Sequence, residues 1–211
     1  MSLERFRKLV TSSQDITRLI GSPSELVIKK QLTQLDEHMK SFIADSPLVL
    51  LGTVSSDGRC DVSPRGDLPC VAKVLDEQTL LMPDWPGNRR ADSLQNIVDT
   101  GRVGLLFLVP GMGETLRING RACVTCDEDL LATVSRGERQ PILGIGIETE
   151  ECYFQCAKAL IRSKLWDGHA QHPDATARHF AEVLLNQTAV DGETVESLAG
   201  QIDESYRNRL Y

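Results

Sequence analysis

Hydrophobic residues are spaced differently in the first quarter of the chain and in its centre. In residues 25–44 they recur every three or four positions, at Ile28, Leu32, Leu35, Met39, Phe42 and Ile43. This period is that of an amphipathic helix, and the preceding Ser22-Pro23-Ser24-Glu25 has the form of a capping box. We therefore predict one helix from about residue 25 to Ala44, ended by Pro47.

The centre of the chain has the pattern of short β-strands. In residues 114–124, polar side chains alternate with apolar or small ones: Leu116, Ile118, Gly120, Ala122 and Val124. Alternation of this kind is typical of a strand with one buried face. Asp57-Gly58 marks a hairpin turn. We predict strands over residues 46–53, 61–63, 70–75, 78–82, 102–109, 114–124 and 142–147, the last extending toward residue 154.

Helical patterns flank and interrupt these strands, over residues 2–20, 127–134, the first part of 154–166, 173–186 and 193–209. Antiparallel strands joined by tight turns usually close into a barrel, because closure removes exposed edges. A doubly wound α/β sheet fits less well, since helices and strands do not alternate regularly. We predict an α+β fold dominated by β: an antiparallel barrel with peripheral helices.

A loop of unusual chemistry, Pro83-Asp84-Trp85-Pro86-Gly87-Asn88-Arg89-Arg90, precedes a further helical pattern. Asn88 is a good N-cap residue, so Asn88, Arg89 and Arg90 should lie at a helix N-terminus. Unpaired backbone donors and two guanidinium groups would make an anion site there, and a phosphate is the expected ligand. The alternative is a capped surface helix with solvated arginines.

Composition restricts the classes of protein. The chain has 211 residues, 41% hydrophobic, which fits one soluble domain with helical additions. It contains no apolar run near the roughly 20 residues that cross a membrane, and its N-terminus lacks a signal-peptide layout, so we expect a cytoplasmic protein. The net charge of −7 argues against a general nucleic-acid surface.

Six cysteines and several histidines raise the question of a metal site. Cys123-x-x-Cys126 with Cys152-x-x-x-Cys156 could be imagined as a zinc site, but buried free thiols fit a reducing compartment better. The spacing of His169, His172 and His179 matches no familiar site. We expect no metal, and no protein-borne nucleophile is recognisable.

Four segments together carry a family resemblance: DVSPRGD at 61–67, PDWPGNRR at 83–90, a PG..ETLRINGRA segment at 110–122, and CAKALIRSKLW at 156–166. With them the sequence resembles the pyridoxamine 5'-phosphate oxidase-like flavin-binding proteins, which have a split β-barrel fold. The resemblance covers roughly residues 25–170. It implies a barrel domain over 25–170, with helical extensions over 1–24 and 171–211.

The resemblance also implies a homodimer with FMN held in clefts between subunits. The flavin phosphate would lie at Asn88–Arg90, the Ser63-Pro64-Arg65 segment along the ring and ribityl chain, and further residues would approach from the other subunit or close the dimer. The cofactor-binding candidates are Ser63, Pro64, Arg65, Pro83, Trp85, Asn88, Arg89, Arg90, Arg117, Lys158, Arg162, Ser163 and Trp166.

For several of these residues a plainer role is open. Arg65 could raise the flavin's reduction potential, or it could pair with Asp67 or Asp61 in a turn. Trp85 could cover the flavin or substrate, or merely pack beside the neighbouring prolines. Arg117 and Arg121 could bind phosphate, or form an exposed strand face paired with carboxylates.

The expected function is an FMN-dependent oxidoreductase that passes a hydride between flavin and a small molecule, with a nicotinamide or oxygen as second partner. The alternative is a non-catalytic split barrel that carries or senses flavin, haem or a deazaflavin. Gln155 stands where many relatives have histidine, and the segment with which true pyridoxamine phosphate oxidases hold pyridoxal phosphate is lacking, so that specific activity is not expected.

Overall fold

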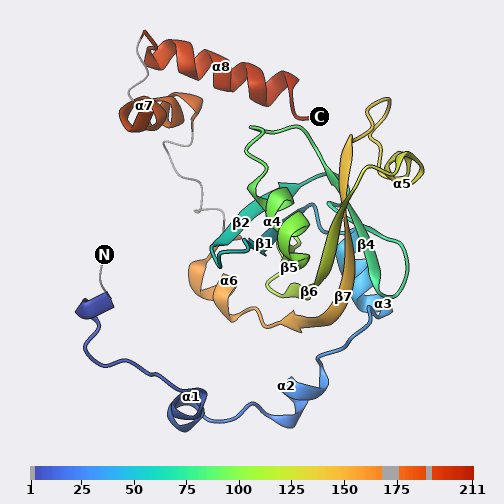
Figure 1. Ribbon diagram of the computed structural model, residues 1–211, viewed down its shortest axis with the longest axis vertical. Helices are drawn as coiled ribbons and strands as arrows, with labels where there is room; N and C mark the ends of the chain where they lie inside the picture. Colours follow the sequence, from blue (N-terminus) through green and yellow to red (C-terminus); the bar gives the residue numbers. More distant parts are fainter. Residues whose placement is uncertain (1–2, 168–175, 189–191) are drawn as a thin grey trace.

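The computed structural model describes residues 3–167, 176–188 and 192–211. In this part of the chain seven antiparallel strands form one sheet, in the order β2-β1-β5-β6-β7-β4-β3 (Figure 1). The strands are β1 (Leu48–Val54), β2 (Cys60–Gly66), β3 (Lys73–Val74), β4 (Thr79–Asp84), β5 (Arg102–Leu108), β6 (Thr115–Thr125) and β7 (Leu143–Gln155).

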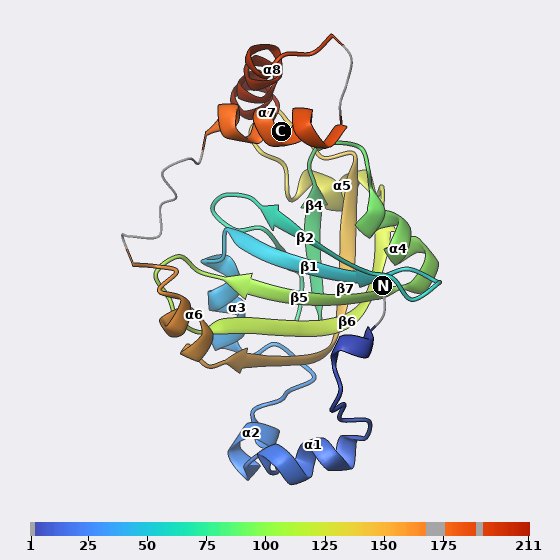
Figure 2. The ribbon, with the colours of Figure 1, turned by 90° about the vertical axis from the view of Figure 1, so that its left-hand side faces the viewer.

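The sheet is strongly curved, as Figure 2 shows for β1, β5, β6 and β7. It is not a closed ring, because β2 and β3 stand at its two ends. Side chains bridge the opening: Arg65 of β2 forms a part-buried ion pair with Asp84 of β4. The predicted antiparallel split barrel with peripheral helices is therefore confirmed, with an opening between β2 and β4.

The core fills the inside of the curved sheet. In β1 every second residue is buried, namely Val49, Leu51 and Thr53, as the period of a strand requires. Phe42 of α3 (Glu37–Ala44) belongs to the core and meets Phe154 edge to face, with ring centroids 5.3 Å apart. Each such buried apolar side chain stabilises the fold by about 1.5–3 kcal/mol.

The longest strand pair, β6 and β7, contains one irregularity. Their register shifts between Asn119 and Gly120, so β7 has an extra residue at this point. A Cβ on Gly120 would lie 2.0 Å from the backbone oxygen of Glu148. No side chain fits so close an approach, which explains why a glycine stands here.

The helices are peripheral: η1 (Leu3–Arg5), α1 (Ser13–Ile20), α2 (Glu25–Lys29), α3 (Glu37–Ala44), α4 (Asp92–Thr100), α5 (Glu128–Ala132), α6 (Lys158–Ser163), α7 (Ala177–Thr188) and α8 (Val195–Asn208). The helices α1 and α2 lie on one side of the sheet, and α7 and α8 on the opposite side (Figures 1 and 2). Among the described residues, no helix is both long enough and apolar enough to cross a membrane.

The predicted single helix over residues 25–44 is wrong. The chain forms α2 and α3 separately, because the backbone of Leu32 pairs with that of Cys152 through two hydrogen bonds of 2.9 and 2.8 Å. Asp36 then caps α3 by accepting from the amide of Met39 at 2.8 Å. The predicted capping box is absent as well, since Ser24 is the N-cap of α2 and makes no side-chain cap hydrogen bond.

Two further boundaries differ from the prediction. The expected strand over 70–75 is reduced to β3, because the amide of Val71 donates to Ser46 at 2.9 Å instead of to a strand. The expected helix over 2–20 is limited to η1 and α1. The strands β1, β4, β5 and β6 begin and end within two residues of their predicted limits. The strand β7 begins within one residue of its predicted start and runs to Gln155.

Candidate functional site

The inward face of β2 is polar, which is unusual for a strand packed beneath a helix. Asp61, Ser63 and Arg65 alternate along it and are partly buried beside α4. Ser93 of α4 donates to Asp61 at 2.7 Å, and its hydroxyl lies 3.0 Å from that of Ser63. Arg65 Nε donates to the Ser63 hydroxyl at 3.4 Å. These bonds attach the first turn of α4 to the DVSPRGD segment.

A cleft of about 260 Å³ opens where β2 ends and the loop after β4 begins. It brings together four residues that the sequence singled out: Pro64, Arg65, Pro83 and Trp85. Arg65 pairs with Asp84, not with Asp67 or Asp61 as the plainer alternative supposed. Two segments about 20 residues apart in the chain therefore form one site.

Asp67 is the centre of this site. Its side chain is 1% exposed and forms an ion pair with Arg136, 3.0 Å from Oδ2 to the guanidinium. The indole Nε1 of Trp85 donates to the same oxygen at 2.9 Å, and the amide of Leu68 donates to Oδ1 at 2.8 Å. A buried carboxylate with this many donors is fully compensated, so it fixes the loops that contribute them.

The C-terminal segment reaches the same carboxylate. The hydroxyl of Tyr211 donates to Asp67 Oδ1 at 3.1 Å, and its ring meets Trp85 edge to face at 5.0 Å. Arg139 donates to the Tyr211 backbone oxygen at 3.0 Å, and Leu210 lines the cleft. Burial, and then the charge of Asp67, raise the pKa of Tyr211 above its usual range.

The loop before α4 has an unusual backbone. Arg89 and Ala91 both have positive φ, 61° and 57°, a region that residues other than glycine seldom adopt. Asn88 accepts from the amide of Arg90 at 3.0 Å, so it turns its own loop and is not the N-cap of α4 as predicted. That helix begins at Asp92 after Ala91, without a side-chain cap.

The two arginines of this loop have different surroundings. Arg90 forms an ion pair with Asp92 and lines a second cleft, of about 240 Å³, with Arg59, Asp61 and Gln95. The exposed guanidinium of Arg89 has no hydrogen-bond or ion-pair partner among the described residues. The backbone thus holds one uncompensated cation beside the open N-terminus of α4.

The remaining predicted site residues lie elsewhere. Lys158 and Arg162 of α6 line a cleft of about 450 Å³ with Lys30, Tyr153 and Gln155. Within the described residues, no hydrogen bond or ion pair joins this cleft to the one beside Trp85. One chain therefore holds two separate groups of predicted cofactor-binding residues.

Three predicted residues stand around this second group. Arg117 of β6 donates to the Tyr153 hydroxyl at 3.1 Å. Ser163 donates to the backbone of Leu160 at 3.0 Å, and Trp166 donates to the backbone of Met112 at 2.7 Å. Arg121, by contrast, donates from one guanidinium nitrogen to both carboxylate oxygens of Glu148, at 2.8 Å each, as the plainer alternative for it supposed.

The prediction of buried cysteines is correct for Cys152 and wrong for four others, while Cys70 is half-buried. The thiols of Cys60, Cys123, Cys126 and Cys156 are exposed, because they lie on outer faces or in turns. Burial raises the pKa of Cys152 to about 11. No group of three potential metal ligands gathers in the part of the chain that the structure describes. His169 and His172 lie outside that part, and His179 is exposed on α7.

Several residues of the site were missing from the sequence prediction. Asp84 stands inside a segment that carried the resemblance and was assigned no role, and Asp67 was considered only as a partner of Arg65 in a turn. Arg136 and Tyr211 could not be found, since they reach Asp67 from 69 and 144 positions away in the chain. The sequence did offer a signal for the two carboxylates, because both stand inside segments that carry the family resemblance.

Comparison with known protein families identifies the family of this chain. Residues 35–156, more than half of the chain, match the pyridoxamine 5'-phosphate oxidase family. Among curated proteins, none matches the sequence.

Several solved structures are similar to part of the chain. A protein named "putative pyridoxamine 5'-phosphate oxidase" from Lactobacillus delbrueckii is 26% identical, with 59% of this chain and 98% of that one covered, at a TM-score of 0.47. HupZ of Group A Streptococcus is 18% identical (56% and 91%, TM-score 0.45). An FMN-binding protein of Syntrophomonas wolfei is 11% identical (55% and 82%, TM-score 0.43). These structural similarities add nothing to the sequence match over residues 35–156. On that match, the chain belongs to the pyridoxamine 5'-phosphate oxidase family.

Proposed function

We propose that the protein binds FMN and acts as an FMN-dependent oxidoreductase on a small molecule. The observation that carries the proposal is the uncompensated guanidinium of Arg89. It is held by a loop with two positive-φ residues, directly before a helix without a side-chain cap. Strained backbone persists where the surrounding structure enforces it, and it is concentrated at binding sites.

The phosphate of FMN fits this place chemically. It carries close to two negative charges, and each charge-assisted hydrogen bond contributes roughly 1.5–3 kcal/mol. Arg89 is free to make such a bond, and the amides of the first turn of α4 add donors. Arg90 would exchange its exposed partner Asp92 for the phosphate at little cost, because an exposed ion pair is worth at most about 1 kcal/mol.

The ring and ribityl chain would lie along Ser63, Pro64 and Arg65, with Pro83 and Trp85 on the other side of the cleft. When bound, FMN supplies hydride or electron transfer. Ser63 and Arg65 offer a hydroxyl and N–H donors on the inner face of β2. Asp84 holds the Arg65 guanidinium in place, so the cation is positioned before any ligand arrives.

We propose a homodimer with the cofactor between subunits. The argument is the separation of the two groups of residues: Lys158 and Arg162 do not meet the Trp85 cleft within one chain. Across a dimer, a second copy would bring Lys158, Arg162, Ser163 and Trp166, with Arg117, to the cofactor. NAD(P)H or oxygen would be the other reactant. We place this acidic protein in the cytoplasm, without nucleic-acid or membrane partners.

The first test is the visible absorption spectrum of the purified protein, repeated on the supernatant after heat denaturation. Flavin bands released on heating support the proposal. A Soret band instead would favour a haem carrier. Bound flavin that neither nicotinamide nor another reductant reduces would contradict the enzymatic part of the proposal.

The phosphate assignment has its own test, the double variant Arg89→Ala/Arg90→Ala. We expect loss of flavin with retention of the dimer in size-exclusion chromatography, because both side chains are exposed. The matched control is Arg18→Ala/Arg207→Ala, which removes the same charge from two exposed arginines on α1 and α8. Normal flavin occupancy in the first double variant would contradict the assignment.

A further inference from the structure

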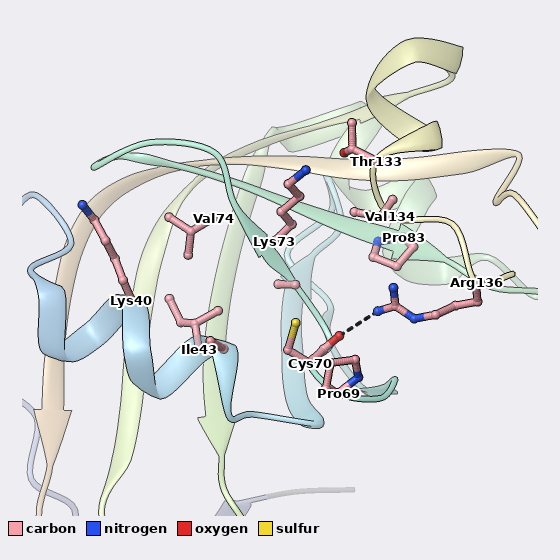
Figure 3. A pocket seen from close by; sticks show the side chains of 12 residues that line it. Lys40, Ile43, Pro69, Cys70, Lys73, Val74, Pro83, Thr133, Val134 and Arg136 are labelled. Carbon is pink, nitrogen blue, oxygen red and sulfur yellow. Dashed lines mark hydrogen bonds between the residues drawn. The ribbon is translucent and has the colours of Figure 1, made fainter.

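A fourth cleft, of about 350 Å³, is drawn in Figure 3 and shares Pro83 with the cleft of the proposed flavin site. Its walls are α3, residues 69–74 and the turn that follows α5. The volume falls within the range of small-molecule sites, about 300–1,000 Å³. Neither the proposed function nor the segments that carry the resemblance use the α3 wall.

The lining of this cleft combines apolar side chains with cations. The apolar part consists of the buried Ile43 and Val134 and the half-buried Val74. Three cations stand around them, Lys40, Lys73 and Arg136, with Lys73 between the other two in the view of Figure 3. No carboxylate lines this cleft among the described residues, although the chain as a whole carries a net charge of −7.

The three cations differ in how far they are compensated. Lys40 is paired with Glu37 at 2.9 Å and Glu77 at 3.5 Å. Arg136 is held by Asp67 and donates to the backbone of Cys70 at 3.2 Å, the bond drawn in Figure 3. The ammonium of Lys73 is exposed and has no hydrogen-bond or ion-pair partner in the described part of the chain.

We propose that this cleft binds a small monocarboxylate with an apolar body. The carboxylate would pair with the Lys73 ammonium, and the apolar body would lie over Val74 and Val134. A carboxylate gains an ion pair with the Lys73 ammonium, which a neutral apolar molecule cannot make, and one negative charge matches the single unpaired cation of this cleft. Charge and lining together therefore favour this ligand class.

The test uses octanoate as the probe and 1-octanol as its neutral counterpart, titrated into the full-length protein by isothermal calorimetry. We expect saturable binding of one octanoate per chain, with a Kd on the order of 1 mM, typical of so small a ligand. Octanol should bind about tenfold more weakly. Lys73→Glu should weaken octanoate binding by about tenfold or more, because it places a like charge at the carboxylate.

Two further variants keep the proposal falsifiable. Lys8→Glu makes the same charge change at an exposed residue far along the chain and should leave octanoate affinity within about twofold. Ala44→Phe fills the cleft from an exposed position at the end of α3 and should abolish binding without disturbing the core.

Equal affinity of wild type and Lys73→Glu, or equal affinity for octanoate and octanol, would overturn the proposal, as would the absence of saturable binding. Flavin content separates this result from the proposed function. Lys73→Glu should retain flavin, since Lys73 lines neither the Trp85 cleft nor the Arg90 cleft, and a variant with normal flavin but no octanoate effect contradicts only the proposal for the cleft beside α3.

Discussion

Asp67 and Arg89 mark the two ends of the site along the loop between β4 and α4. Asp67 is bonded to Trp85 near the start of this loop, and Arg89 stands near its end. The surroundings of the two charges are opposite. The carboxylate of Asp67 is 1% exposed and receives donors from Arg136, Trp85 and Tyr211. The guanidinium of Arg89 is exposed and without a partner in the described residues. The charge of Asp67 is thus compensated within the chain, whereas the charge of Arg89 is not, and in the proposed function it would pair with the phosphate of FMN.

This difference predicts that mutations can separate the stability of the site from its proposed binding of FMN. A buried charge that loses its partner is costly, whereas an exposed one is solvated by water at no comparable cost. Substitution of Asp67 should therefore act first on folding. Substitution of Arg89 should act first on ligand affinity.

The largest effect is expected from Asp67→Asn. The amide keeps the shape of the side chain but removes the charge opposite Arg136 and turns an acceptor into a donor facing Trp85 or Tyr211. We expect the free energy of unfolding to fall by about 3 kcal/mol, the scale for breaking a buried ion pair. Urea denaturation followed by circular dichroism measures it.

The control for this variant is Asp99→Asn, which removes the same charge from an exposed position on α4. It should leave the urea midpoint unchanged. If Asp67→Asn were as stable as the control, the Asp67 contacts would be incidental, and the proposed division between the two ends of the site would fail.

How far the sequence predicts this molecule depends on how local the responsible contacts are. The strands β5 and β6 follow from their apolar or alternating patterns, which each strand carries within itself. The break between α2 and α3 does not, because it is caused by the pairing of Leu32 with Cys152, 120 residues away. Helical period alone continues across such a break.

The site shows the same limit. Its segments were predicted from the sequence, and the cleft joins Pro64 and Arg65 to Pro83 and Trp85. The backbone of the Asn88 loop was not, since an asparagine can cap a helix or turn its own loop with the same side-chain oxygen. The domain limits at residues 24 and 170, and the roles of the cofactor-binding candidates, stay predictions.

A smaller effect on stability, with a large one on binding, is expected from Arg89→Gly. Glycine accepts a φ of 61° without the cost of about 1–2 kcal/mol for other residues, although its freer unfolded state offsets roughly 0.5–1 kcal/mol. The urea midpoint should therefore hold or rise slightly. The Kd for FMN should rise about tenfold or more, measured by quenching of flavin fluorescence.

The smallest effect concerns Tyr211 and pH. Because burial and Asp67 raise its pKa, docking of the tyrosine contributes fully below the ordinary value of about 10 and is lost as pH rises through the raised value. The ¹³Cζ resonance of Tyr211 should titrate above pH 10 in the wild type and nearer to 10 in Asp67→Asn. Equal midpoints would show that Asp67 does not act on the tyrosine. A titration midpoint at pH 10 in both proteins would mean that Tyr211 is not buried against Asp67 in solution. In that case the C-terminal segment would not cover the Trp85 cleft, and Asp67 would lack one of its donors.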